Sequence, residues 1–139
     1  MNGAAVPGLD QSKLERNKNV VIDYYRTAFG GDPRKAVADH FGPRYTQHNP
    51  DAEDGPEAFI GFVTWLRGEF PGLRLDIKRV IAEGDMVATH SHLDLDPGDP
   101  ANPGRALADY FRLEDGKVVE HWDVIQDVPA RAANGNGMF

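Results

Sequence analysis

Toward the C-terminal end of this 139-residue chain, two acids and a histidine stand among large apolar residues. Asp109, His121 and Asp123 belong to two strand-like runs that are joined by the turn residues Asp115 and Gly116. Polar groups on a strand face that should be core are costly to bury unpaired, so their presence there indicates a site. An acid beside a histidine suits proton transfer.

The register of this predicted hairpin decides which side chains meet. A two-residue loop, Asp115-Gly116, would set Asp109 opposite Trp122. A three-residue loop, 114–116, matches apolar with apolar and acid with base, as cross-strand pairing favours. We predict the three-residue loop, and its pairs are Phe111 with Val119, Asp109 with His121, and Leu107 with Asp123.

The two faces of the predicted hairpin differ in character. One face is mostly apolar with a few polar groups, as in a cavity lining; it carries Leu107, Asp109, Phe111, Val119, His121, Asp123 and Ile125. The other face carries Ala108, Tyr110, Arg112, Glu120, Trp122 and Val124. That face has too much aromatic and aliphatic surface to be wholly wet, which favours contact with a partner subunit. This surface, together with the family resemblance given below, leads us to predict a homodimer through the outer face of the sheet.

Asp109 and His121 each have a purely structural role as the alternative to a role in the site. Asp109 is either a strand acid held in a salt bridge or an acid that faces the cavity, and its apolar flanks favour the cavity. His121 is either a neutral histidine inside the sheet or the catalytic partner of Asp109. We expect Asp123 to orient a neighbouring group and Phe111 to contact the substrate.

Other candidate residues lie outside the hairpin. Tyr24 stands on an apolar helix face, where it either packs with its hydroxyl at the rim or reaches the site. His48 and Asn49 stand either at the mouth of the cavity or in a loop cap. His90 and His92 share one strand face, but no third ligand follows at metal spacing, so we predict hydrogen bonding there and no metal.

Hydrophobic periodicity predicts the elements that position these residues. Helical spacing predicts a helix over 13–29, with Ser12 and Glu15 as a capping box, a second helix over 33–39 that is capped by Asp32, and a third from Pro56 to Phe70. Residues 41–54 are typical of a short strand that runs into a loop, and residues 73–81 and 86–93 alternate like strands ahead of the hairpin. Three helices and long antiparallel strands predict an α+β fold, a curved sheet around helices with one open mouth.

Length and composition limit the class of protein. The chain fits one domain, which we place at 12–130, between a flexible leader at 1–11 and a tail at 131–139. A net charge of -7 argues against a nucleic-acid partner or an acidic membrane surface. The absence of cysteine removes thiolate chemistry. With no apolar run of about 20 residues and no secretion signal, we expect a cytoplasmic protein.

Three segments carry a resemblance to a known family. They are residues 45–50 (YTQHNP), the turn 82–85 (AEGD), and the hairpin from 109–112 (DYFR) through 115–117 (DGK) to 120–123 (EHWD). With the order of elements, they resemble the SnoaL-like polyketide cyclase group of the nuclear transport factor 2-like (NTF2-like) superfamily of α+β cones. The resemblance covers roughly residues 15–130 and implies an NTF2-like cone.

The resemblance also implies a chemistry. In the cyclases, an aspartate promotes an aldol ring closure without metal or cofactor, and Asp109 matches its position. Ketosteroid isomerase, in the same superfamily, has an oxyanion tyrosine that Tyr24 resembles and a protonated oxyanion acid that Asp109 resembles. Its catalytic base, an aspartate before a proline, is Asn49 here, so steroid isomerisation by that mechanism is disfavoured.

We therefore predict a small enzyme that needs no cofactor and acts on a carbonyl-bearing, partly apolar metabolite. Asp109 would move a proton beside the carbonyl with help from His121, while Tyr24 and His48 hold the oxyanion. The alternative is a non-catalytic cone that binds a small molecule or serves as a dimeric association domain.

Overall fold

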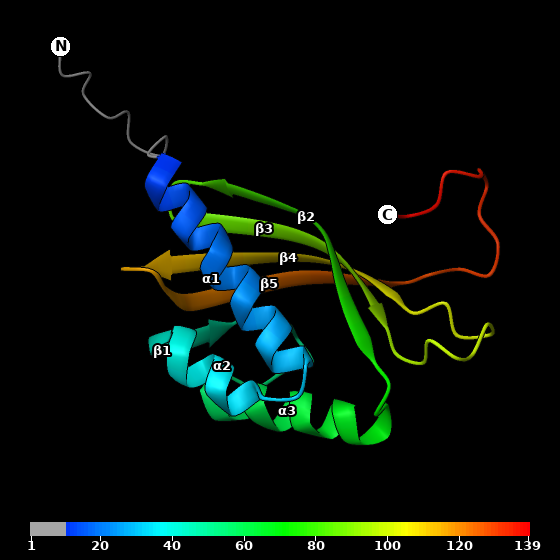
Figure 1. Cartoon of the computed structure of the whole chain (residues 1–139), viewed down its shortest axis with the longest axis horizontal. Helices are drawn as coiled ribbons and strands as arrows, with labels where there is room; N and C mark the ends of the chain where they lie inside the picture. The colour runs from blue at the N-terminus through cyan, green and yellow to red at the C-terminus, as the bar shows by residue number, and fades with distance from the viewer. Residues whose placement is uncertain (1–10) are drawn as a thin grey trace, which may run out of the picture.

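The computed structural model describes residues 11–139 as three helices and one five-stranded sheet (Figure 1). The helices are α1 (Gln11–Phe29), α2 (Pro33–His40) and α3 (Pro56–Glu69). The strands are β1 (Phe41–Gln47), β2 (Arg74–Glu83), β3 (Met86–Asp94), β4 (Arg105–Glu114) and β5 (Lys117–Asp127). Each element lies within a few residues of its predicted position.

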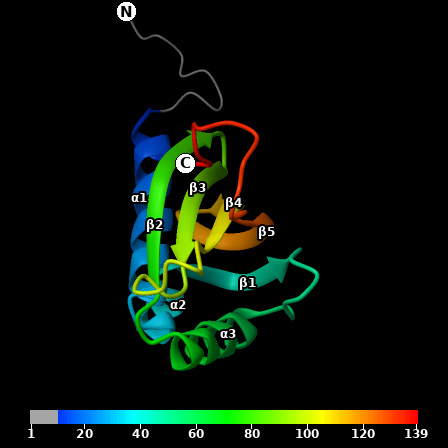
Figure 2. The ribbon, with the colours of Figure 1, turned by 90° about the vertical axis from the view of Figure 1, so that its right-hand side faces the viewer.

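The sheet has the order β1-β5-β4-β3-β2. Its four long strands pair antiparallel, and β1 pairs parallel to β5. Figure 1 shows α1 crossing the long strands, with α2 and α3 near one edge, and the quarter-turn in Figure 2 shows the strands curving beside α1. The predicted α+β cone, helices packed against a curved and mainly antiparallel sheet, is confirmed.

The apolar stripe of α1 explains how the core forms. Val21, Tyr25, Ala28 and Phe29 recur every three or four residues and are all buried.

No helix in residues 11–139 combines the length and the apolar character that a membrane span needs.

The helix starts agree with the sequence in one case and differ in another. Asp32 caps α2 as predicted, and its carboxylate accepts a hydrogen bond of 3.0 Å from the backbone N–H of Lys35. Ser12, however, lies inside α1, which begins at Gln11, so it does not precede the helix as a capping box requires. The rest of the predicted leader lies outside the described residues.

The predicted hairpin register is wrong. The loop has two residues, Asp115 and Gly116, with φ of 51° and 74°, and Glu114 pairs with Lys117 across it. Positive φ at both central residues is the geometry of the tight turn that matches strand twist. The observed pairs are Phe111 with His121, Asp109 with Asp123, and Leu107 with Ile125.

An irregularity after the turn explains why neither of the two simple registers holds. Leu113 pairs with Val118 and Arg112 pairs with Glu120, so Val119 is an extra residue in β5. This bulge shifts the pairing by one residue, which returns the alternation of β5 to the predicted faces. Asp109 and His121 consequently meet as diagonal neighbours on the inner face.

The C-terminal tail turns back over the outer face of the sheet. The ring of Phe139 stacks on those of His92 and His90, with centroids 4.5 and 5.6 Å away. Beyond the tail, Ile81, Tyr110 and Val124 are exposed. The homodimer through this face stays a prediction, and any such interface must accommodate the tail.

Substitution of glycine by alanine should have opposite effects on stability in the hairpin turn and in helix α3. Gly116→Ala should lower the free energy of unfolding by about 1–2 kcal/mol, because alanine resists positive φ. Gly61→Ala should raise it by about 0.5–1 kcal/mol, because glycine weakens a helix interior, and a Cβ on Gly61 would meet no atom within 4 Å. Urea unfolding of both variants checks the pair. Equal effects would contradict the turn geometry.

Candidate active site

A cavity of about 340 Å³ opens between α1, α3 and the inner face of the sheet. Its volume lies in the range of small-molecule pockets, which run from about 300 to 1,000 Å³. Most of the wall is apolar and is formed by Phe29, Phe59, Phe62, Trp65, Leu66, Phe70, Leu93, Leu95, Leu107 and Ile125. Polar side chains gather on β1, β4, β5 and the loop that follows β1.

Asp109 is the most deeply buried acid of this cavity, with 1% of its surface exposed. Its Oδ1 accepts a hydrogen bond of 2.7 Å from the Tyr25 hydroxyl and lies 2.8 Å from Nε2 of His121. Its Oδ2 has no hydrogen-bond partner within residues 11–139. Burial raises the pKa of Tyr25 far above its usual range, so this hydroxyl stays protonated and donates.

Gln47 fixes the protonation of the other ring nitrogen of His121. Its Oε1 accepts hydrogen bonds of 3.0 Å from the backbone N–H groups of His48 and Asn49, so this amide atom is the oxygen. The same oxygen lies 2.8 Å from Nδ1 of His121. An amide oxygen only accepts hydrogen bonds, and Nδ1 therefore carries a proton.

This arrangement leaves a single proton to be shared between Asp109 and His121. Nε2 of His121 and Oδ1 of Asp109 are 2.8 Å apart, and a hydrogen bond of that length needs a proton between them. The pair is either an imidazolium with a carboxylate or a neutral imidazole with a carboxylic acid. Both forms have the same net charge and differ only in which of the two groups holds the shared proton.

Asp123 adds a second carboxylate beside this pair. Its two oxygens accept hydrogen bonds of 2.9 and 3.0 Å from Nδ2 of Asn49, and Oδ2 lies 3.9 Å from Nε2 of His121. Desolvation by partial burial raises the pKa of Asp123, although Asn49 and His121 oppose the shift.

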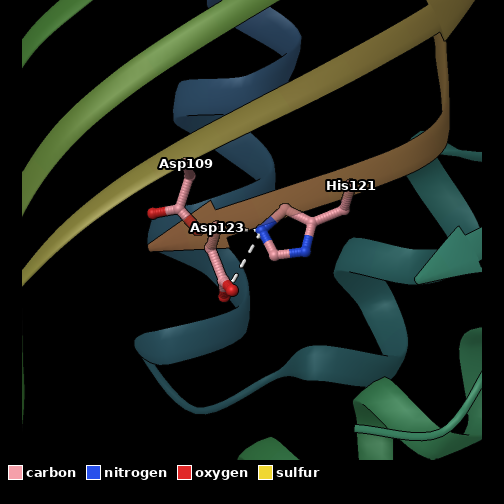
Figure 3. Close-up of side chains that lie close together, drawn as sticks. All are labelled: Asp109, His121 and Asp123. Atoms are coloured by element: carbon pink, nitrogen blue, oxygen red, sulfur yellow. Dashed lines mark hydrogen bonds and ion pairs between the residues drawn. The ribbon is translucent and has the colours of Figure 1, made fainter. Parts of the chain in front are cut away.

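Figure 3 shows Asp109 of β4 and Asp123 of β5 on the same side of the His121 ring. Each of these side chains offers one ligand atom, and the three atoms lie within 4.8 Å of one another. This trio could hold a metal ion through two oxygens and a nitrogen. The expectation of a metal-free site stays a prediction.

A family model for the SnoaL-like domain matches residues 21–121. The chain belongs to the SnoaL-like domain family. The match covers α1 from its middle through most of the hairpin, and it includes Tyr25, Gln47, Asp109 and His121. No curated protein matches the sequence at a significant level.

Solved structures share this fold. One is a protein from Jannaschia sp. CCS1 that is provisionally named a SnoaL-like polyketide cyclase. It is 25% identical to this chain with a TM-score of 0.65, and the alignment covers 85% of this chain and 91% of that one. TsrD from Streptomyces laurentii is 25% identical with a TM-score of 0.64, covering 84% and 90%. AclR from Streptomyces galilaeus, provisionally named a hydroxylase, is 24% identical with a TM-score of 0.65, covering 81% and 76%.

In this SnoaL-like domain, Tyr25 rather than Tyr24 reaches Asp109. Tyr24 is fully buried and packs against Phe41 and Phe59, with ring centroids 5.1 and 5.3 Å away, and it does not line the cavity. The two tyrosines are adjacent on a helix that buries both, so helical periodicity alone does not separate them.

Several other predicted site residues lie away from the cavity. His48 stacks on Trp122 on the outer side of β5, with ring centroids 4.7 Å apart, and its Nε2 lies 2.7 Å from Oε2 of Glu120. His90 and His92 face the tail residue Phe139. These three histidines are therefore not cavity groups, which removes the oxyanion role predicted for His48.

The remaining predicted residues lie at or next to the site. Asn49 and Asp123 line the cavity, while Phe111 is fully buried behind it and packs on the rings of Tyr25 and His121, each 5.0 Å away. Gln47 was missed by the sequence analysis, although strand alternation from the buried Tyr45 places it on the same face.

The raised pKa of Asp123 predicts a pH-dependent stability difference. Its protonated form is favoured by folding, so its contribution is present below the unfolded pKa, about 3.9, and is lost as pH rises through the folded value. Asp123→Asn should therefore gain stability relative to the wild type as pH rises above about 4. Chemical unfolding across pH 4 to 7 measures this, and a relative loss for the variant would contradict it.

Proposed function

We propose that this protein is an enzyme that moves a proton at a carbon next to a carbonyl group, in an aldol cyclisation or an isomerisation. The observation that carries the proposal is the buried Asp109, which is hydrogen-bonded to Tyr25 and His121 at the wall of an apolar cavity. The family membership and the 25% identity to the provisionally named Jannaschia cyclase support the same class.

The free oxygen of Asp109 is the proposed base. Oδ2 has no partner in the described chain, whereas Oδ1 is occupied by two groups. In the imidazolium–carboxylate form, Oδ2 takes a proton from the carbon beside the carbonyl, which leaves an enolate and a neutral carboxylic acid. The His121 imidazolium then balances the charge of the enolate.

The same proton completes the reaction. In a cyclisation, the enolate carbon attacks a second carbonyl of the substrate, and the resulting alkoxide takes the proton back from Asp109. In an isomerisation, a different carbon of the enolate system takes it. Either route returns Asp109 to a carboxylate without an added reactant. Asp109 is almost fully buried, and low local dielectric strengthens the electrostatic interactions of this step.

A second candidate is a ligand-binding domain without turnover. Its supporting observation is the apolar mouth, where Phe62, Trp65 and Ile125 line the cavity yet remain 47, 58 and 43% exposed. Exposed apolar surface of this kind suits ligand entry whether or not a reaction follows.

The proposal predicts exchange of carbon-bound protons in a simple ketone. The wild type should accelerate deuterium uptake by β-tetralone in heavy water, followed by NMR, and Asp109→Asn should lower the enzyme-dependent rate by about 10²–10⁴-fold, the range of general-base effects. Asp76→Asn removes an exposed strand acid paired with Lys78 and should leave the rate unchanged.

Two controls sharpen this test. A chelator in the buffer reveals any contribution of a metal at the Asp109, His121 and Asp123 trio. Binding of the ketone measured by its effect on tryptophan fluorescence separates the two candidates, because a pure binding domain would bind without exchange. Equal exchange by the wild type and Asp109→Asn, or none above background, would contradict the enzyme proposal.

A further inference from the structure

The charges around the cavity are unevenly distributed. Within the described chain, Arg105 is the only lysine or arginine that lines it. The acidic side chains of the lining are Asp51, Glu53, Asp109 and Asp123. The positive form of His121 is paired with Asp109, and the acidic groups of the lining would repel an anion, so Arg105 is the cation of this wall that can attract one.

Arg105 and Asp109 point to the same face of one strand. They are four residues apart on β4, and side chains alternate along a strand, so both face the cavity with Leu107 between them. A strand rises about 3.4 Å per residue, which separates their Cα atoms by about 14 Å. The stretch between them is apolar, with Leu107 and its cross-strand partner Ile125.

The guanidinium of Arg105 has capacity for another partner. Its single ion pair within residues 11–139 joins Nε to Oδ1 of Asp127 at 3.2 Å, and the side chains of Arg105 and Asp127 are 46 and 85% exposed. Exposed pairs of this kind contribute little stability. The two terminal nitrogens remain free to donate to a planar anion in the forked geometry that arginine favours.

We propose that Arg105 binds a carboxylate on the substrate and so sets the orientation of the substrate in the cavity. This inference rests on the proposed function for the identity of the reacting end. The substrate class is an apolar carbonyl compound with a carboxylate at the end remote from the reacting carbon. Apolar contacts with Leu107 and Ile125 hold the middle of the molecule, and Asp109 meets the reactive end.

Binding of a matched pair of probes tests this without turnover. Biphenylcarboxylate and biphenylcarboxamide share shape and apolar surface and differ in charge. By calorimetry, the wild type should prefer the carboxylate by about tenfold, and Arg105→Gln should lose that preference while it binds the amide as before. Arg34→Gln removes an exposed arginine paired with Glu57, outside the cavity lining, and should retain the preference.

A variant that should gain affinity distinguishes the loss of an ionic contact from a loss of binding caused by misfolding. Asp127→Asn removes the acid that pairs with Arg105 in the described chain and should strengthen carboxylate binding by about two- to fivefold at low salt. No preference for the carboxylate in the wild type, or a preference that survives Arg105→Gln, would overturn the inference. Neither result bears on proton exchange at Asp109, which its own asparagine variant tests.

Discussion

The buried hydrogen bonds of Asp109 are the interaction on which the site depends. A charged or polar group at 1% exposure is costly unless it is paired, and here Tyr25 and His121 supply both contacts to one oxygen. These partners come from α1 and β5, while Asp109 lies on β4. The site therefore forms only when helix and sheet are packed together, and the other oxygen of Asp109 keeps its capacity for a further partner.

The parallel strand β1 explains how His121 is held. Gln47 pairs with His121 in the sheet, and the backbone N–H of His48 donates to the carbonyl of His121 at 3.0 Å. Two backbone N–H groups orient the Gln47 amide, and that amide orients the imidazole. Asn49, two residues after Gln47, donates to Asp123. The end of β1 and the loop that follows it thus hold His121 and Asp123 in place.

Sequence periodicity was sufficient for the fold and for the face of the sheet that carries Asp109, His121 and Asp123. It was insufficient for their pairing, because a bulge at Val119 follows from twist and packing and not from alternation. It also could not separate Tyr24 from Tyr25, since α1 buries both. The failure for His48 has a different cause: at the end of β1 the chain directs this side chain to Glu120 and Trp122, outside the cavity.

The location of protons on His121 tests the account most directly. Two-bond proton–nitrogen NMR spectra of the labelled protein report which ring nitrogen is protonated. The account predicts that Nδ1 of His121 carries a proton in the folded protein, where it donates to Oε1 of Gln47, and that Gln47→Leu abolishes this fixed state. A neutral His121 protonated on Nε2 in the wild type would contradict it, because Nδ1 would then carry no proton and transfer of the Nε2 proton to Asp109 would leave an imidazolate anion.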